Sequence, residues 1–208
     1  IAQVRDEVGV FEISFQLSPR INAAGRLVNA DTALRLMLSD NLDEARKLAQ
    51  ELDTHNKERQ TIEKGIADQA IGTIRSQFDS KRDYVIIEGQ MYWHIGVVGI
   101  VASRVLREFY RPTIILGGEG TEWRGSGRSV NGFDLAEALR TCDDLLVRHG
   151  GHAMAAGMSI DPKNLEKFRK RINAYAEQQM TKECLTPILH LDADVPLAEL
   201  TLDRMEEL

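Results

Sequence analysis

The feature that most constrains this chain is a run of apolar residues at three- and four-residue steps between residues 42 and 78. This spacing predicts one long amphipathic helix, because it places the apolar side chains on a single helical face. The stripe breaks at residues 55–59, and Gly65 and Gly72 weaken the prediction, but no proline interrupts the run. A helix of this length is more often a spacer between two lobes than part of one compact core.

Upstream of this helix the sequence predicts a strand and a short helix. Residues Val10–Phe15 alternate between apolar and polar side chains, which indicates a short strand, and Ser18-Pro19 ends it. Asp31 is a favourable N-cap, and the leucines that follow predict a helix over residues 32–38.

Downstream of the long helix, strands and helices alternate. The expected strands cover residues 84–87, 113–116, 122–130 and 154–160, and the expected helices cover residues 95–109, a segment that begins at Asp134, and residues 162–180. This alternation indicates an α/β domain of about a hundred residues with a mixed sheet. Residues 188–195 then read as the first strand of a further domain.

Composition excludes several classes of protein. Hydrophobic residues make up 43% of the 208 residues, which is ordinary for a globular chain with a real core. The two cysteines, Cys142 and Cys184, match no ligand spacing and are too few for a disulfide framework, so a reducing, cytoplasmic setting is expected. No apolar run is long enough to cross a membrane, so we expect no membrane association. The start is neither a signal peptide nor an initiator methionine, and we expect an excised fragment.

The formal net charge of −6 argues mildly against a nucleic-acid partner, but the distribution of charge argues for one. Every positive side chain between residues 88 and 131 is an arginine. Arginine suits a two-pronged hydrogen bond to phosphate. The competing interpretation places most of these arginines on solvated helix faces.

Three segments rich in small residues are candidates for binding an anionic ligand. The first is Ser18–Arg26, in which small side chains are framed by two arginines. Small residues would let a ligand backbone come close, while Asn22 and Arg26 would supply hydrogen-bond donors. A tight turn whose arginines pair with nearby acids explains the pattern equally well.

The second segment, Trp93–Arg104, places Gly96 and Gly99 at the start of a predicted helix. Free backbone N–H groups and the helix dipole favour an anion there. Taken alone, the pattern favours the alternative that both glycines let the helix lie close on the sheet. Arg104 is a weaker candidate for contact with a nucleic acid.

The third segment is split between the end of one predicted strand and the start of another. Ser126, Arg128 and Ser129 in the first part are donors of the kind that a phosphate needs. The second part, residues 149–157, contains three glycines, which permit unusual backbone angles and close approach.

His152 is the main reaching side chain of that second part, and it follows Gly150 and Gly151. It could donate to a phosphate, or it could be a structural histidine that binds no ligand. A zinc site with His149 and Cys142 is a third possibility, but nothing elsewhere completes four ligands.

The pattern Gly-Gly-His-x-x-Ala-Ala-Gly at residues 150–157 resembles the signature of the DHH-associated domain, the nucleic-acid-binding lobe of the DHH phosphoesterase superfamily. The same signature occurs in nanoRNases, cyclic-dinucleotide phosphodiesterases and alanyl-tRNA synthetases. The rest of the chain resembles RecJ-like single-stranded-DNA-specific exonucleases. The segments that carry this resemblance are Pro19–Leu27, the long helix, Trp93–Arg104, Gly127–Leu135 and Leu185–Asp194.

The resemblance implies four parts. Residues 1–40 would end a DHH domain, residues 41–80 would form the interdomain helix, residues 81–183 would form the DHH-associated domain, and residues 184–208 would begin an oligonucleotide-binding barrel. The expected fold class is therefore α/β, with a mixed sheet between the helix and the barrel entry.

The resemblance also implies a function. Enzymes of this kind hydrolyse single-stranded DNA from 5′ to 3′ in DNA repair and recombination, with Mn²⁺ or Mg²⁺ held by an upstream lobe that contains an Asp-His-His run. No such run occurs here, so we expect this chain to hold no metal and to lack activity alone. Two alternatives are a DHH phosphodiesterase acting on short RNA or cyclic dinucleotides, and a non-catalytic nucleic-acid-binding module.

Site roles follow from the same resemblance. Ser126 and Arg128 would form a terminal-phosphate pocket, with Ser129 nearby. His152 would act catalytically beside a phosphate near the metals, together with the N–H groups of Gly150 and Gly151. Asn22, Arg26 and Arg104 would contact the strand.

Overall fold

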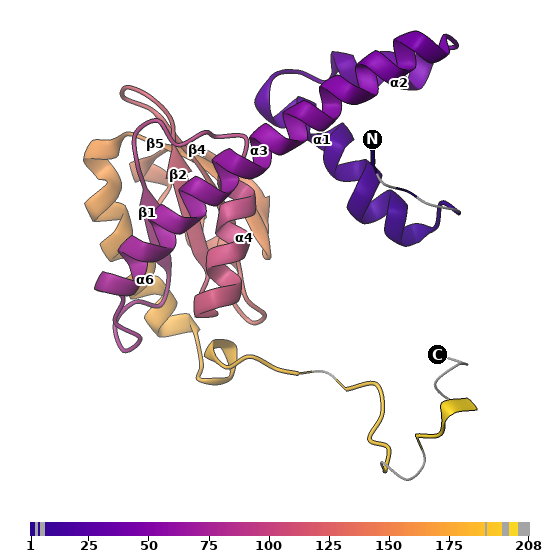
Figure 1. Ribbon diagram of the computed structural model, residues 1–208. Helices are drawn as coiled ribbons and strands as arrows, with labels where there is room; N and C mark the ends of the chain where they lie inside the picture. Colours follow the sequence, from indigo (N-terminus) through magenta and orange to yellow (C-terminus); the bar gives the residue numbers. More distant parts are fainter. Residues whose placement is uncertain (3, 5–6, 190, 197–199, 204–208) are drawn as a thin grey trace.

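The computed structural model describes residues 1–2, 4, 7–189, 191–196 and 200–203 (Figure 1). Helix α3, Leu42–Gln77, is the long helix that the sequence predicts. Asn41 caps it by accepting hydrogen bonds from the N–H groups of Asp43 and Glu44. In Figure 1, α3 runs from the N-terminal helices to the sheet domain, so it links the two parts of the molecule.

The strand predicted for Val10–Phe15 is wrong, because this segment is helical. A π-helix, η1, covers Glu12–Leu17 and continues directly into α1, Ser18–Leu27. The apolar–polar alternation of this segment led to the wrong prediction because Phe11 and Phe15 are also one helical turn apart. Their ring centroids lie 5.1 Å from each other.

Pro19 is the second residue of α1 and does not end a strand. It follows the π-helix directly and contributes no backbone N–H at this junction. Ala23 and Ala24 are fully buried where α1 packs on α3. The short helix α2, Asp31–Leu38, matches its predicted range, although the N-cap is Ala30 and Asp31 is the first helical residue.

The sheet domain contains a five-stranded sheet in the order β1-β2-β3-β5-β4. The strands are β1 Ile86–Gly89, β2 Thr113–Gly117, β3 Trp123–Arg128, β4 Leu146–His152 and β5 Ala155–Ile160. Strands β1 and β2 pair in parallel, and all other pairs are antiparallel. The predicted α/β fold with a mixed sheet is therefore confirmed. Strand β4 was not among the predicted strands, because its two consecutive glycines weaken any β pattern.

Helices cover the two faces of this sheet unequally. The main helices of the domain are α4 Val98–Phe109, α5 Leu135–Arg140 and α6 Leu165–Gln179. Helices α5 and α6 bury one face in a core that contains Ile114 and Met158. Helices α3 and α4 cover the other face around Ile86 and Ile115. Helix α4 packs on β2 and β3, and the same face of the sheet continues past the helix along β5 and β4.

The predicted strand at residues 188–195 is not present in the part that the structure describes, since residues 188–189 and 191–195 form no helix or strand. Residues 190, 197–199 and 204–208 of the expected barrel entry lie outside the described residues, and the barrel entry stays a prediction. Within the described ranges, no helix has both the length and the hydropathy needed to span a bilayer.

Candidate nucleic-acid interface

One face of the sheet extends past α4 along β5 and β4, and the row positions of β3 beside α4 border it; we call this surface, with its β3 border, the open face. Its rows across the three strands are Arg128, Ala155 and His152; Ser126, Gly157 and Gly150; and Arg124, Ser159 and Arg148. Residues paired directly across neighbouring strands point to the same side of a sheet. The middle row is nearly free of side chains, and a Cβ built on Gly150 would meet nothing within 4 Å. A ligand can therefore approach the backbone there.

Arg128 folds along β3 toward the start of α4. Its Nη1 donates to Ser126 Oγ at 2.9 Å and to the Gly127 carbonyl oxygen at 2.8 Å. A Cβ built on Gly99, in the first turn of α4, would lie 3.0 Å from both Arg128 Nη2 and Ser126 Oγ. Glycine at position 99 thus lets α4 begin directly beside this pair, as the packing interpretation expects.

The anion interpretation of the same helix start also fits. The N-cap residue, Val97, offers no side-chain hydrogen bond. Its carbonyl oxygen accepts from the N–H groups of Ile100 and Val101 at 2.9 and 3.1 Å. The N–H groups of Val98 and Gly99 donate to no acceptor in the described part of the chain. These two donors are available to a bound anion.

Arg26 reaches this position from α1. Its Nη1 donates to the Gly96 carbonyl oxygen at 3.2 Å, across 70 residues of sequence. A Cβ built on Gly96 would lie 2.0 Å from the Arg26 carbonyl oxygen, so only glycine permits the approach. Asn22 is exposed one turn earlier on α1. The first two predicted segments therefore meet, although the first is a helix and not a turn.

Arg26 and Arg128 together form a positive corner, which is the name we use for this pair and the start of α4. Burial, and then repulsion from Arg26, lower the pKa of Arg128 from its ordinary value. In the described ranges neither guanidinium forms an ion pair. Two uncompensated cations beside two available N–H groups favour an anion such as phosphate.

His152 lies at the end of β4, exposed and on the open face. Within the part of the chain that the structure describes, the His152 side chain has no hydrogen-bond or ion-pair partner. The geometry therefore does not support the alternative of a structural histidine. His149 lies three residues earlier, and its Nε2 is 3.0 Å from Asp143 Oδ1. Cys142 is fully buried.

The zinc interpretation therefore fails. No three His, Cys, Asp or Glu side chains of the described residues are grouped to hold a metal ion. His149 and His152 also differ by an odd number of positions on one strand, which points them to opposite faces.

Two further candidates have other contacts. Ser129 is buried, and its hydroxyl donates to the Phe133 carbonyl oxygen at 2.7 Å, so it holds a turn. Arg104 Nη1 lies 3.4 Å from Glu63 Oε1 on α3.

Gly151 has φ +145°, and a Cβ there would lie 2.5 Å from backbone atoms of β5. Its glycine is thus explained by local packing, whereas Gly150 is open.

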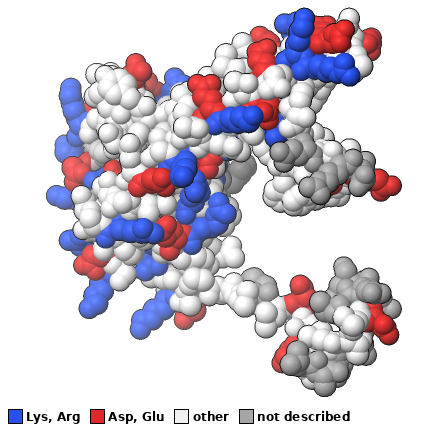
Figure 2. Space-filling view, viewed as in Figure 1, with Lys and Arg blue, Asp and Glu red and all other residues white. Residues whose placement is uncertain are grey.

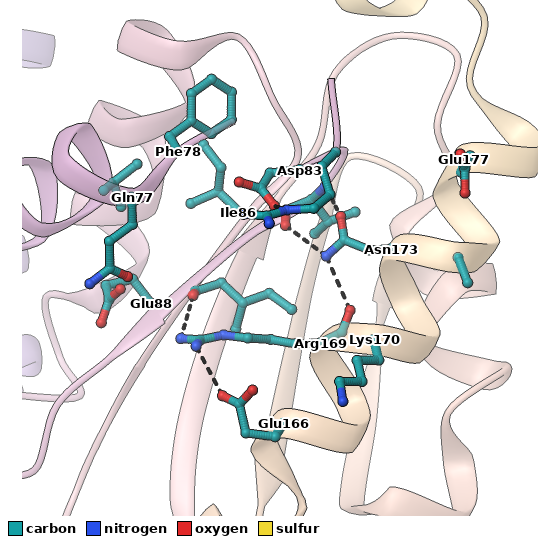
Figure 3. A pocket seen from close by; sticks show the side chains of 15 residues that line it. Gln77, Phe78, Asp83, Ile86, Glu88, Glu166, Arg169, Lys170, Asn173 and Glu177 are labelled. Carbon is teal, nitrogen blue, oxygen red and sulfur yellow. Dashed lines mark hydrogen bonds and ion pairs between the residues drawn. The ribbon is translucent and has the colours of Figure 1, made fainter. Parts of the chain in front are cut away.

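A cavity of about 620 Å³ lies at the other edge of the sheet, between β1, the end of α3 and α6 (Figure 3). Asn173 Oδ1 accepts from the Val85 N–H at 2.9 Å, and its Nδ2 donates to the Val85 carbonyl oxygen at 3.1 Å. Arg169 Nη2 donates to the Ile87 carbonyl oxygen at 2.8 Å. These side chains satisfy the free edge of β1, which would otherwise expose unpaired backbone groups.

Figure 2 shows how charge is distributed over one view of the molecule. The surface is hollowed between the sheet domain and the N-terminal helices, and Lys and Arg side chains gather on the sheet domain along the border of this hollow. The negative net charge of the chain therefore does not prevent a locally positive surface.

Comparison with known proteins agrees with this geometry. Residues 82–178 match the family model of the DHHA1 domain. The chain is 38% identical over 198 residues to the single-stranded-DNA-specific exonuclease RecJ of Bacillus subtilis, covering 94% of this chain and 25% of that protein. It is 38% identical over 201 residues to the Escherichia coli protein of the same name, covering 92% and 34%.

The solved structures give the same result. The crystal structure of RecJ in complex with Mg²⁺ from Thermus thermophilus matches with a TM-score of 0.73 and 40% identity, covering 80% of this chain and 26% of that one. The Mn²⁺ complex from the same organism matches with a TM-score of 0.72 and 40% identity, covering 80% and 24%.

Residues 82–178, which include all five strands of the sheet, form a DHHA1 domain that follows the long helix α3. The chain belongs to the RecJ-like proteins over the more than nine-tenths of its residues that align with them. The chain spans 25–35% of the length of these curated relatives, although more than nine-tenths of its own residues align with them. The described residues do not fit a metal site.

Proposed function

We propose that this chain is the nucleic-acid-binding portion of a RecJ-like exonuclease that degrades single-stranded DNA in repair and recombination. The observation that carries the proposal is the positive corner, where Arg26 and Arg128 have no counter-ion among the described residues and lie beside two N–H groups of α4 that have no acceptor there. Phosphate contacts supply much of the affinity of proteins for single strands. The relatives named RecJ support the choice of substrate.

In this proposal Ser126 and Arg128 bind the terminal phosphate, and Arg26 and Asn22 contact the strand from α1. His152, with the backbone of Gly150, contacts a phosphate at the end of the open face. In the intact protein His152 donates a hydrogen bond to that phosphate as charge builds during hydrolysis, so we assign it a catalytic role.

Divalent metal chemistry in the intact protein belongs to residues upstream of this chain in our proposal. The chemistry that Mn²⁺ or Mg²⁺ supplies in such sites is activation of the attacking water and stabilisation of the leaving oxygen. Digestion would proceed from 5′ to 3′. A reducing, cytoplasmic compartment also belongs to the proposal, and the free thiols of Cys142 and Cys184 support it.

Fluorescence anisotropy with labelled oligonucleotides tests the binding step. We expect micromolar or weaker affinity for single strands, lower affinity for duplex, and a steep loss of affinity with added salt, because each phosphate contact releases counterions. Tight binding that ignores salt would contradict the proposal and favour a protein partner.

The catalytic step needs the intact protein. Manganese-dependent digestion of single strands blocked at either end reports both activity and polarity. Release of nucleotides only from an open 5′ end supports the exonuclease, whereas cleavage restricted to short RNA or cyclic dinucleotides supports the alternative phosphodiesterase.

A further inference from the structure

The open face carries a second cluster of arginines, away from the positive corner. Arg124 of β3 and Arg148 of β4 both pair with Ser159 of β5, so they share one row of the sheet and point to the same side. A cavity of about 340 Å³ lies at this row, and its lining includes both arginines, Gly150, Gly157 and Ser159. We call it the arginine pocket.

The side chains of the arginine pocket are arranged to receive an anion. Arg148 Nε donates to Ser159 Oγ at 3.2 Å, which fixes the orientation of its guanidinium. Arg124 is exposed and has no hydrogen-bond or ion-pair partner among the described residues. The middle row connects this pocket to the positive corner, and its one side chain, that of Ser126, already accepts a hydrogen bond from Arg128.

The acid that pairs with Arg148 does not neutralise the pocket. Glu122 Oε1 lies 3.6 Å from Arg148 Nη2, and the two side chains are 42% and 63% exposed. Such an exposed ion pair contributes little, and a phosphate can replace the carboxylate at small cost. The pocket therefore keeps a net positive charge.

We infer that the arginine pocket is a second phosphate subsite, which holds the backbone of the same single strand whose terminal phosphate lies in the positive corner. This inference rests on the proposed function and adds a second contact to it. Arg124 and Arg128 lie four positions apart on one strand, or about 13 Å between Cα atoms at about 3.3 Å per residue. A single strand repeats its phosphates at spacings well below this distance, so the two anchors can hold different phosphates of one strand.

The test compares ligands with one and with several phosphates. Binding of thymidine 5′-monophosphate and of a 5′-phosphorylated thymidine strand about ten nucleotides long is measured for this chain and for Arg124→Ala, Arg148→Ala and Arg128→Ala. Arg124→Ala and Arg148→Ala should each weaken binding of the strand about tenfold and leave the mononucleotide unchanged. Arg128→Ala should weaken both ligands.

Salt dependence supplies a second readout that loss of structure would not produce. Each of the two pocket variants should lower the slope of log affinity against log salt by about 0.7, the value for one phosphate contact on a single strand. Arg124→Lys retains the charge and should recover most of the affinity. Arg140→Ala is the matched control, because it removes an equally exposed arginine from α5 on the other face of the sheet.

The outcomes separate the inference from the proposed function. If Arg128→Ala weakens binding while both pocket variants bind the strand like the unchanged chain, the second subsite is overturned and the positive corner stands. If none of the three variants changes binding, the proposed function fails together with the inference. If Arg140→Ala weakens binding as much as the pocket variants do, the effect is one of net charge, and the inference is overturned.

Discussion

Arg128 and His152 lie on different strands but in one row of the sheet, because each pairs with Ala155 of β5. This places a charged donor and an imidazole on the same side with only a methyl group between them. This arrangement requires β5 to lie between β3 and β4. The two residues are 24 positions apart in the sequence, and only the strand order brings them together.

Arg128→Ala should weaken binding of single-stranded DNA about ten- to a hundredfold, since a charged hydrogen bond contributes roughly 1.5–3 kcal/mol. The melting temperature should change little, because the side chain donates only to Ser126 and to one carbonyl oxygen of its own strand. Anisotropy and thermal melting on the same preparation measure both quantities. Removing the 5′-phosphate from the ligand should shrink the difference between variant and unchanged chain. An early melt with normal affinity per folded molecule would make Arg128 structural.

Gly96→Ala should destabilise the chain by about 1–3 kcal/mol, because the new methyl group would lie 2.0 Å from the Arg26 carbonyl oxygen and must displace α1 or its own loop. Gly65→Ala is the matched control. Gly65 lies inside α3 with nothing within 4 Å of an added Cβ, so alanine there should raise stability by about 0.5–1 kcal/mol. Chemical denaturation measures both. Two variants of equal stability would show that α1 does not pack on this loop.

Asn173→Ala should cost about 1–3 kcal/mol of unfolding free energy, because both edge-facing backbone groups of Val85 lose their partner. DNA binding should not change, since this edge of the sheet is remote from the open face in strand order. Asn173→Asp is informative as a comparison, since it keeps the acceptor for the Val85 N–H and loses the donor. An alanine variant as stable as the unchanged chain would mean that water satisfies the edge equally well.

Asp53 should make the packing of α1 on α3 sensitive to acid. Its Oδ2 lies 2.7 Å from Lys57 Nζ and its Oδ1 lies 2.8 Å from Arg20 Nε. Hydrogen bonds from Lys57 and then Arg20 lower its pKa, against the burial that raises it. Because the pKa is lower in the folded state than the unfolded value of about 3.9, the stabilisation is present above that pH and is lost below it.

The matching experiment follows the free energy of unfolding from neutral pH to about pH 3 for the unchanged chain and for Asp53→Asn. The difference between them should be largest near neutrality and should shrink below about pH 4. A difference that stays constant across this range would show that the carboxylate charge contributes nothing to the fold.

The sequence predicted the long helix and the mixed sheet well, because both depend on local periodicity. The helix η1 was missed because Phe11 and Phe15 fit both a two-residue and a four-residue spacing, and their packing decides between the two. Strand β4 was missed because it contains two glycines of low strand preference, which its pairing with β5 stabilises.

The candidate site was partly predictable for a similar reason. The types of residues in the three segments indicated phosphate binding, but the meeting of Arg26 with Gly96 depends on tertiary packing. The row that joins Arg124 to Arg148 depends on strand order, which the sequence alone did not reveal. The available indication was a pair of arginines four positions apart on one predicted strand, Arg124 and Arg128, since an even spacing places both on one face.

His152→Ala in the intact protein should slow cleavage about ten- to a thousandfold, the scale on which loss of one positioned donor acts. Single-turnover digestion with saturating strand isolates this step from binding. Melting temperature should be unchanged, because His152 is exposed and has no partner within the described residues. Metal content should also be unchanged, since no group of ligands surrounds it in the described part.

His149→Ala is the matched control for this experiment, because it removes an imidazole from the same strand but from the opposite face, where Asp143 holds it. It should leave single-turnover cleavage unchanged. His152→Gln, which keeps a donor at a similar reach, should recover part of the lost rate if the imidazole acts by hydrogen bonding. Unchanged cleavage in His152→Ala, together with a lower melting temperature, would make His152 a structural residue, and equal losses in both histidine variants would remove the open face from the mechanism.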